Sequence, residues 1–454
     1  MKNTKKLLAL ALVLVMLSAL SATVFAANGS ITITPPTGMP ADATITYKIY
    51  KVFDAAGDGT NISYKLVSGK TTAPAGFTVD AAGNVSYSGT STGDSLTAAD
   101  IAAIAAYVTD ADLVATVTSV NGADAVASNL PNGYYYISTT TGTVVTIDTT
   151  NPNATVNDKN EPPEVDKKIT GASSYDENGK KALAQIGTEV EFTATVTVGV
   201  GQMNYVFKDT MTSGLTYVEN SITVTGIPAA GYTVVTASGQ NIQIDFDNTE
   251  IAKLADGAEI VIKYKATITE VALDDDPENN TATISYGENS QYTSEPVETK
   301  VYNAKFTVIK TDKEGTAMEG AGFVLKNADG KYYKLDGSVV SWVDAEADAT
   351  ELITAKDATT GKATVSFTGL ANGTYTLVEK TVPTGYNKAA DYTFTVAEHD
   401  YTAANLQQEA TVVNNPGTEL PSTGGIGTTL FYAIGAILVL GAGVVLVTKR
   451  RVRG

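Results

Sequence analysis

The chain has 454 residues with 49 acidic and 31 basic side chains, no Cys and one His. A formal net charge of −18 disfavours binding to nucleic acid or to an anionic membrane surface. Without Cys there is neither a disulfide nor a thiolate metal site, so we expect no cofactor and no metal. The acidic run at 274–278 lacks the alternating oxygen ligands of a calcium loop. A solvated turn is favoured there, and calcium binding stays an open alternative.

The N-terminus predicts a secretory signal peptide. Three lysines precede an apolar stretch from Leu7 to about Leu20, and small residues up to Ala26 offer a cleavage site before Ala27. The stretch is too short for a second membrane span. The exported chain is therefore expected to begin at Ala27.

The region between the two apolar ends predicts β-strands almost throughout. Thr, Val and Tyr alternate in short runs between Gly, Asn and Asp turns, as in Gly29–Thr34 and Val190–Val196. One helix is expected after the capping box that begins at Thr97. The pattern predicts an all-β fold of three tandem immunoglobulin-like β-sandwich domains. The expected divisions are a signal peptide (1–26), an N-terminal domain (27–160), a second sandwich (161–302), a third sandwich (303–416) and a C-terminal segment with a transmembrane helix (417–454).

The C-terminal segment has three parts in a fixed order. It contains Leu420, Pro421, Ser422, Thr423 and Gly424, then an uncharged apolar run, then a basic tail. The apolar run is long enough to cross a hydrocarbon core of ~30 Å as a helix, and the basic tail should stay cytoplasmic.

This order resembles the cell-wall sorting signal of Gram-positive surface proteins, whose pattern is Leu-Pro-x-Thr-Gly. The resemblance implies that a sortase cuts between Thr423 and Gly424 and transfers the Thr423 carboxyl to an amine. It also implies a secreted, peptidoglycan-anchored product that is retained only transiently in the membrane.

Three polar residues of the third domain alternate with apolar ones on its expected strands. They are Lys310 near the start, Glu379 in the middle and Asn414 at the end, and all should face inward. Burying such a set of polar side chains costs free energy, and the cost falls if they react with one another. An apolar site lowers the pKa of a lysine and raises that of a carboxyl, so a neutral amine could attack the amide while the acid shuttles protons and ammonia leaves. The product would be an amide cross-link between the first and last strands.

The motifs around these residues carry a second resemblance. Phe306-Thr-Val-Ile-Lys-Thr-Asp312 and Tyr375-Thr-Leu-Val-Glu379 resemble the isopeptide-forming B-type repeat domain of collagen-adhesin and pilin proteins. The resemblance implies that Lys310 and Asn414 form the bond and that Glu379 is the catalytic acid.

The second domain resembles the A-type isopeptide domain of the same proteins. Alternation turns Lys167 and Asn280 inward, and the predicted bond joins them. The segment around Asp209 resembles the one that carries the family's acid, so Asp209 is the expected catalytic group. Glu189 and Glu191 remain alternative acids.

The first domain repeats the Leu-x-Asn-Gly-x-Tyr-x box of the third, but Thr139 stands in the position of Glu379. Because the Thr139 hydroxyl, with its very high pKa, cannot replace a carboxyl as the proton shuttle there, no bond is expected in this domain. The segment Val156-Asn-Asp-Lys-Asn160 resembles the motif whose lysine joins the subunits of shaft pilins, although Asn157-Asp158 replaces the usual Tyr-Pro. Lys159 is the expected acceptor amine, with Lys305 as a rival.

These resemblances imply a structural subunit, not an enzyme, of a sortase-assembled pilus. The partners implied are identical subunits, a class C-type pilin sortase, a housekeeping sortase and peptidoglycan. Tip pilins, basal pilins and a host ligand are further candidate partners. The alternatives are an adhesin attached singly to the wall and an ancillary pilin of the same domain type. The sequence names no host ligand and does not separate shaft from ancillary subunits.

Overall fold

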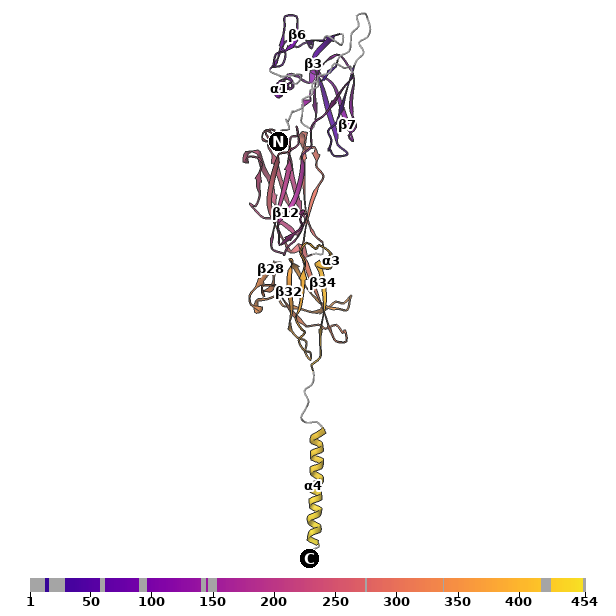
Figure 1. Cartoon of the computed structure of the whole chain (residues 1–454), viewed down its shortest axis with the longest axis vertical. Helices are drawn as coiled ribbons and strands as arrows, with labels where there is room; N and C mark the ends of the chain where they lie inside the picture. The colour runs from indigo at the N-terminus through magenta and orange to yellow at the C-terminus, as the bar shows by residue number, and fades with distance from the viewer. Residues whose placement is uncertain are drawn as a thin grey trace, which may run out of the picture.

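The computed structural model describes residues 13–15, 29–57, 62–89, 96–139, 144–145, 153–273, 276–337, 339–417 and 426–451. Three β-domains follow one another along the long axis, and a single helix lies at the C-terminal end (Figure 1). Each domain is built from two sheets, as expected from the alternating sequence. The all-β prediction is confirmed.

The first domain has a large sheet, a small sheet and one helix. The large sheet has the path β1-β9-β3-β4-β6-β5, with β10 on β9 and β7 on β3; the small sheet is β11-β2-β8. The elements are β1 (Val13–Val15), β2 (Gly29–Thr34), β3 (Thr44–Gly57), β4 (Ile62–Leu66), β5 (Phe77–Val79), β6 (Asn84–Tyr87), α1 (Ala98–Tyr107), a 3-10 turn (Asp110–Asp112), β7 (Leu113–Val120), β8 (Ala125–Leu130), β9 (Gly133–Thr139), β10 (Val144–Val145) and β11 (Asn153–Asn157).

Two local predictions for this domain are confirmed. Thr97 caps α1 through a capping box, in which Asp100 N donates to Thr97 Oγ1 at 3.2 Å and Thr97 N donates to Asp100 Oδ2 at 2.9 Å. These contacts satisfy amide groups that the first turn leaves unpaired. The strand expected at Gly29–Thr34 is β2. Within the expected signal peptide, the structure describes only β1, which pairs with β9.

The second domain packs a five-stranded sheet on an eight-stranded one. The first follows β12-β15-β21-β17 with β18 on β21, and the second follows β13-β14-β24-β22-β16-β20-β19 with β23 on β22. The strands are β12 (Glu164–Gly171), β13 (Ser174–Tyr175), β14 (Lys181–Leu183), β15 (Glu189–Thr197), β16 (Val206–Met211), β17 (Leu215–Tyr217), β18 (Thr223–Thr225), β19 (Tyr232–Ser238), β20 (Asn241–Phe246), β21 (Glu259–Ile268), β22 (Glu278–Tyr286), β23 (Tyr292–Thr293) and β24 (Val297–Tyr302). Its short helical segments are α2 (Asn248–Ile251) and 3-10 turns at Ala229–Gly231, Glu270–Leu273 and Glu288–Ser290.

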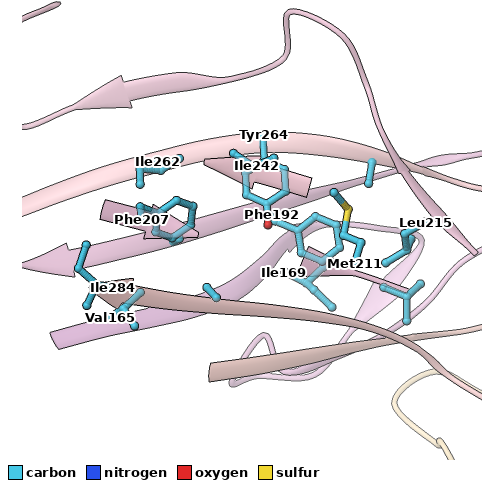
Figure 2. Close-up of a cluster of buried hydrophobic side chains, with 14 of the residues drawn as sticks. Val165, Ile169, Phe192, Phe207, Met211, Leu215, Ile242, Ile262, Tyr264 and Ile284 are labelled. Carbon is cyan, nitrogen blue, oxygen red and sulfur yellow. The ribbon is translucent and has the colours of Figure 1, made fainter. Parts of the chain in front are cut away.

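Alternating apolar side chains from both sheets fill the space between them. Phe192 of β15 and Tyr264 of β21 stack at 5.5 Å between ring centroids, close to Ile242 and Met211 (Figure 2). All four are at most 4% exposed. Burial of such large side chains contributes about 1.5–3 kcal/mol each. This closed core determines the environment of any polar group inside it.

The third domain has a four-stranded sheet, β30-β31-β25-β34, facing a larger one, β28-β27-β26-β32-β33 with β29 on β26. Its first strand begins at Ala304 and contains the motif from Phe306 to Asp312. The elements are β25 (Ala304–Asp312), β26 (Gly322–Lys326), β27 (Tyr332–Asp336), β28 (Val339–Val343), a 3-10 turn (Glu346–Asp348), β29 (Leu352–Ile353), β30 (Ala355–Lys356), β31 (Ala363–Leu370), β32 (Gly373–Thr381), β33 (Tyr392–Val396), α3 (Ala403–Leu406) and β34 (Gln407–Asn414).

The second and third domains contact each other through side chains. Trp342 Nε1 donates to Gln185 Oε1 at 2.6 Å, and Gln185 Nε2 donates to the carbonyl of Val340 at 2.8 Å. Tyr401 donates to the carbonyl of Lys181 at 3.0 Å. These hydrogen bonds give the junction a defined geometry.

The C-terminal helix α4 (Ile426–Arg451) contains a 22-residue segment, Leu430–Arg451, that is long and apolar enough to cross a membrane. None of that span is buried against the rest of the chain. It ends in Lys449, Arg450 and Arg451, as expected for a cytoplasmic tail. The five residues Leu420 to Gly424 lie outside the described residues.

Candidate functional sites

The second domain brings Lys167, Asp209 and Asn280 together. Lys167 stands on β12 of the smaller sheet, whereas Asp209 and Asn280 stand on neighbouring strands β16 and β22 of the larger one. All three are at most 1% exposed. Lys167 Nζ forms an ion pair with Asp209 Oδ2. The inward orientation expected for Lys167 and Asn280 is confirmed.

Burial shifts the ionisation of this pair. Removal from water lowers the pKa of Lys167 to about 8, although the Asp209 charge opposes the shift. Burial raises the pKa of Asp209, and Lys167 opposes that change. Both shifts bring the pair closer to its neutral form, an amine and a protonated carboxyl. A neutral amine is the form that can attack a carbonyl.

Tyr264 completes the site and was not anticipated from the sequence. Its hydroxyl oxygen accepts from Lys167 Nζ at 2.7 Å and from Asn280 Nδ2 at 2.9 Å. It also donates to Asp209, and burial together with that carboxylate raises the pKa of Tyr264 well above its usual value. Its place in the inward row of β21, between Ile262 and Ala266, was the available signal.

The two alternative acids lie elsewhere. Glu189 is half exposed and pairs with Lys265 Nζ at 2.9 Å. Glu191 accepts from Thr170 Oγ1 at 3.0 Å on the outward face of β15. Of the three candidate acids, only Asp209 lies beside Lys167.

The third domain assembles Lys310, Glu379 and Asn414 in a different arrangement. Asn414 Nδ2 donates to both carboxylate oxygens of Glu379, at 2.9 and 3.2 Å. Lys310 Nζ instead donates to the carbonyls of Thr311 at 3.0 Å and Val412 at 3.1 Å. Lys310 and Asn414 are fully buried, and Glu379 is 2% exposed. Burial lowers the pKa of Lys310, while the charge of Glu379 opposes the shift.

The acceptor atoms at both sites have a common feature. Asn280 Oδ1 and Asn414 Oδ1 are buried and lack a hydrogen-bond partner among the described residues. An unpaired buried acceptor costs about 1–3 kcal/mol. A protonated carboxyl could supply the missing donor, and the same contact would polarise the amide carbonyl for attack. Both sites can therefore support amide exchange between lysine and asparagine.

The first domain holds a related polar cluster, in which the described contacts join hydroxyls to a carboxyl. Its last strand β11 pairs in parallel with its strand β2, as β34 pairs with β25 in the third domain. In this register the positions of Lys310 and Asn414 correspond to Ile33 and Asp158. Asp158 is buried, accepts from Tyr47 at 3.1 Å and is also hydrogen-bonded to Thr139. Burial raises the pKa of Asp158.

Lys159 is the second residue after the end of β11 and is exposed, whereas its neighbours Asp158 and Asn160 are buried. The backbone on either side is fixed: Asp158 N donates to Thr34 O at 2.9 Å, and Glu161 N donates to Val200 O at 3.0 Å. The lysine therefore lies between two anchored residues where the first domain meets the second. Lys305, its rival, lies in β25 of the third domain.

No group of three or more potential metal ligands occurs in the described part of the chain. Residues 274 and 275 of the acidic run lie outside it. Calcium binding at 274–278 therefore stays an open prediction.

Comparison with protein families finds two matches. Residues 304–410 match the SpaA prealbumin-like fold domain, and residues 412–452 match the LPXTG cell wall anchor motif. The third domain is thus prealbumin-like, and the C-terminal segment anchors the chain to the cell wall. The chain matches no curated protein sequence.

Solved structures resemble the chain over a longer span. The T6 backbone pilin of Streptococcus pyogenes, described as a modular three-domain structure, is 18% identical with a TM-score of 0.51. That match covers 82% of this chain and 80% of the other. The pilus 2b backbone protein of group B streptococcus is 28% identical with a TM-score of 0.46, covering 56% of this chain and 99% of the other. The first match extends the shared fold beyond the third domain.

Proposed function

We propose that this chain, a cell-wall-anchored surface protein of the Gram-positive pilin type, is the repeating subunit of a covalent pilus. Two Lys–Asn amide bonds stiffen each subunit. The observation that carries the proposal is the pair of fully buried lysines, each enclosed with an acid and an asparagine.

The internal chemistry follows from burial. Burial removes Lys167 and Lys310 from water and lowers their pKa values, which raises the fraction of neutral amine that can attack. Asp209 and Glu379 pass protons between the attacking amine and the departing nitrogen. Each reaction joins lysine Nζ to asparagine Cγ and releases one ammonia. The products are the bonds Lys167–Asn280 and Lys310–Asn414.

Polymerisation would use the exposed lysine and the sorting signal. A class C-type pilin sortase forms an acyl intermediate with Thr423, and Lys159 of a second subunit attacks it. The exposure of Lys159 between anchored neighbours supports this role, because an acceptor amine must reach the enzyme's acyl group. A housekeeping sortase would transfer the finished polymer to peptidoglycan.

The test of polymerisation is the wall fraction of cells that express the chain with its pilin sortase. The parent should give a ladder of polymers that survives boiling in detergent. Lys159→Ala should give wall-anchored monomer alone, whereas Lys168→Ala, which changes an exposed lysine, should retain the ladder. A ladder from Lys159→Ala would contradict the assignment, and loss of the ladder in Lys305→Ala instead would transfer it to Lys305. A parent that gives monomer alone would favour the singly anchored adhesin.

A further inference from the structure

The Tyr264 hydroxyl lies among the reacting groups of the second domain. Its oxygen is 2.7 Å from Lys167 Nζ and 2.9 Å from Asn280 Nδ2, and it also bonds to Asp209. Its ring stacks on Phe192 in a closed apolar core (Figure 2). A residue needed only for packing would require no hydroxyl here, as Phe192 itself illustrates.

The Tyr264 hydroxyl connects Asp209, the acid of this domain, to the amide of Asn280. Asp209 pairs with the amine of Lys167, and no described hydrogen bond joins it to the amide of Asn280. The departing nitrogen of Asn280 must nevertheless gain a proton, because NH₂⁻ is not a viable leaving group. The hydroxyl of Tyr264 contacts both the carboxyl and that nitrogen.

The third domain needs no such bridge. There both oxygens of Glu379 contact Asn414 Nδ2 directly. Close to Lys310 Nζ, the described structure has the thioether of Met318 at 3.9 Å rather than a hydroxyl. Methionine sulfur accepts weakly and cannot donate. The hydroxyl therefore occurs at the site where the acid does not reach the amide.

We propose that Tyr264 is a further catalytic residue of the second domain, which relays a proton from Asp209 to the departing nitrogen of Asn280. The inference rests on the proposed function, because it requires the Lys167–Asn280 bond. It adds a fourth group to the lysine, acid and asparagine.

The proton steps balance. The neutral amine of Lys167 attacks Cγ of Asn280, and a C–N bond forms. Protonated Asp209 then gives its proton to the Tyr264 oxygen, while the Tyr264 hydroxyl gives its own proton to Nδ2. The Cγ–Nδ2 bond breaks and ammonia leaves. The excess proton on Nζ passes to Asp209, so the carboxyl and the tyrosine both return to their starting states.

The test is a time course of bond formation in the chain from Ala27 to Thr423. Protein recovered unfolded in urea is diluted into refolding buffer and quenched at intervals. Peptide mass mapping then reports the two bonds separately. Tyr264→Phe should slow formation of the Lys167–Asn280 bond by at least about a hundredfold, the lower end of the usual contribution of a general acid. The Lys310–Asn414 bond of the same molecules should keep its parental rate.

The matched control is Tyr205→Phe. Tyr205 is equally buried in the same domain, but its hydroxyl accepts from Gly199 N at 3.0 Å, away from the site. This variant should form both bonds at parental rates. A parental rate for the Lys167–Asn280 bond in Tyr264→Phe would overturn the relay while leaving the bond itself established. Absence of that bond in the parent would instead overturn the proposed function.

A second variant covers the case in which Tyr264→Phe does not refold, judged by protease resistance of the second domain. Replacing Tyr264 with 3-fluorotyrosine keeps the hydroxyl and the packing but makes the phenol more acidic. If Tyr264 relays the proton, the Lys167–Asn280 bond should then form at a changed rate. A rate identical to that of the parent would contradict the relay.

Discussion

The second and third domains hold the same three residue types but connect them differently. In the second, Lys167 and Asn280 come from opposite sheets. In the third, Lys310 and Asn414 stand on neighbouring parallel strands of one sheet. The acid also changes partner, since Asp209 contacts the amine whereas Glu379 contacts the amide. The same three residue types therefore occur in two different arrangements for the proposed reaction.

The difference has a mechanical consequence for the proposed pilus. In the third domain the load would enter at β25 and leave after β34, so the Lys310–Asn414 bond would remove nearly the whole domain from the force path. In the second domain the chain continues from Asn280 through β24 before it leaves. About 20 residues would therefore remain under load. The third domain should be the less extensible of the two.

Removal of either acid is the most severe test of the comparison. Asp209→Asn and Glu379→Gln keep the size of each side chain but take away its proton transfer. Each should slow its own bond by at least about a hundredfold and leave the other at its parental rate. The refolding time course with peptide mapping measures both bonds. Loss of both bonds in one variant would contradict their independence.

Single-molecule stretching tests the force path. The parent's third domain should release no chain length, whereas Asn414→Ala should release about 100 residues, or roughly 340 Å. Asn280→Ala should produce a similar gain in the second domain. If the parent releases the full length of the third domain, the Lys310–Asn414 bond does not carry the load.

The rate of bond formation in the second domain should pass through a maximum as the pH rises. There, Lys167 and Asp209 share one proton in the reactive form, and burial lowers the pKa of Lys167 to about 8. Above that pH the pair loses the proton that must reach Asn280, so the rate should fall roughly tenfold per pH unit. At low pH, once Asp209 is protonated as well as Lys167, the rate should fall again. Refolding into buffers of graded pH measures this profile, and a rate that keeps rising above pH 9 would contradict the shared proton.

The smallest expected effect concerns the junction between the two domains. Gln185→Ala removes the hydrogen bonds to Trp342 and Val340 and should cost about 1–3 kcal/mol of junction stability. Faster hydrogen exchange of the Trp342 indole would report the change, with both amide bonds intact in the mass spectrum. Unchanged exchange would mean that other contacts hold the junction.

Much of this arrangement follows from strand alternation. Val165 and Ile169 flank Lys167 at two-residue spacing, and all three face inward as predicted. The same rule could have excluded the alternative acids, because Glu189 and Glu191 alternate with buried Val190. Alternation decides which face a residue occupies, and it does so within one strand.

The contacts between sheets could not be predicted from the sequence. Tyr264 reads as an ordinary core aromatic in its strand, and only the packing of β21 against β16 and β22 shows what its hydroxyl meets. Whether an acid reaches the amine or the amide likewise depends on the spacing of the two sheets. The cluster of Tyr47, Thr139 and Asp158 could be predicted only in part, because the sequence pointed to Thr139 but not to its partners.

The most direct test of the central claim is the intact mass of the folded segment from Ala27 to Thr423, followed by peptide mapping. The account predicts a mass lower by two ammonias than the sequence requires. It also predicts cross-linked peptides joining Lys167 to Asn280 and Lys310 to Asn414, with none in the first domain. A mass equal to that of the plain sequence would contradict the account.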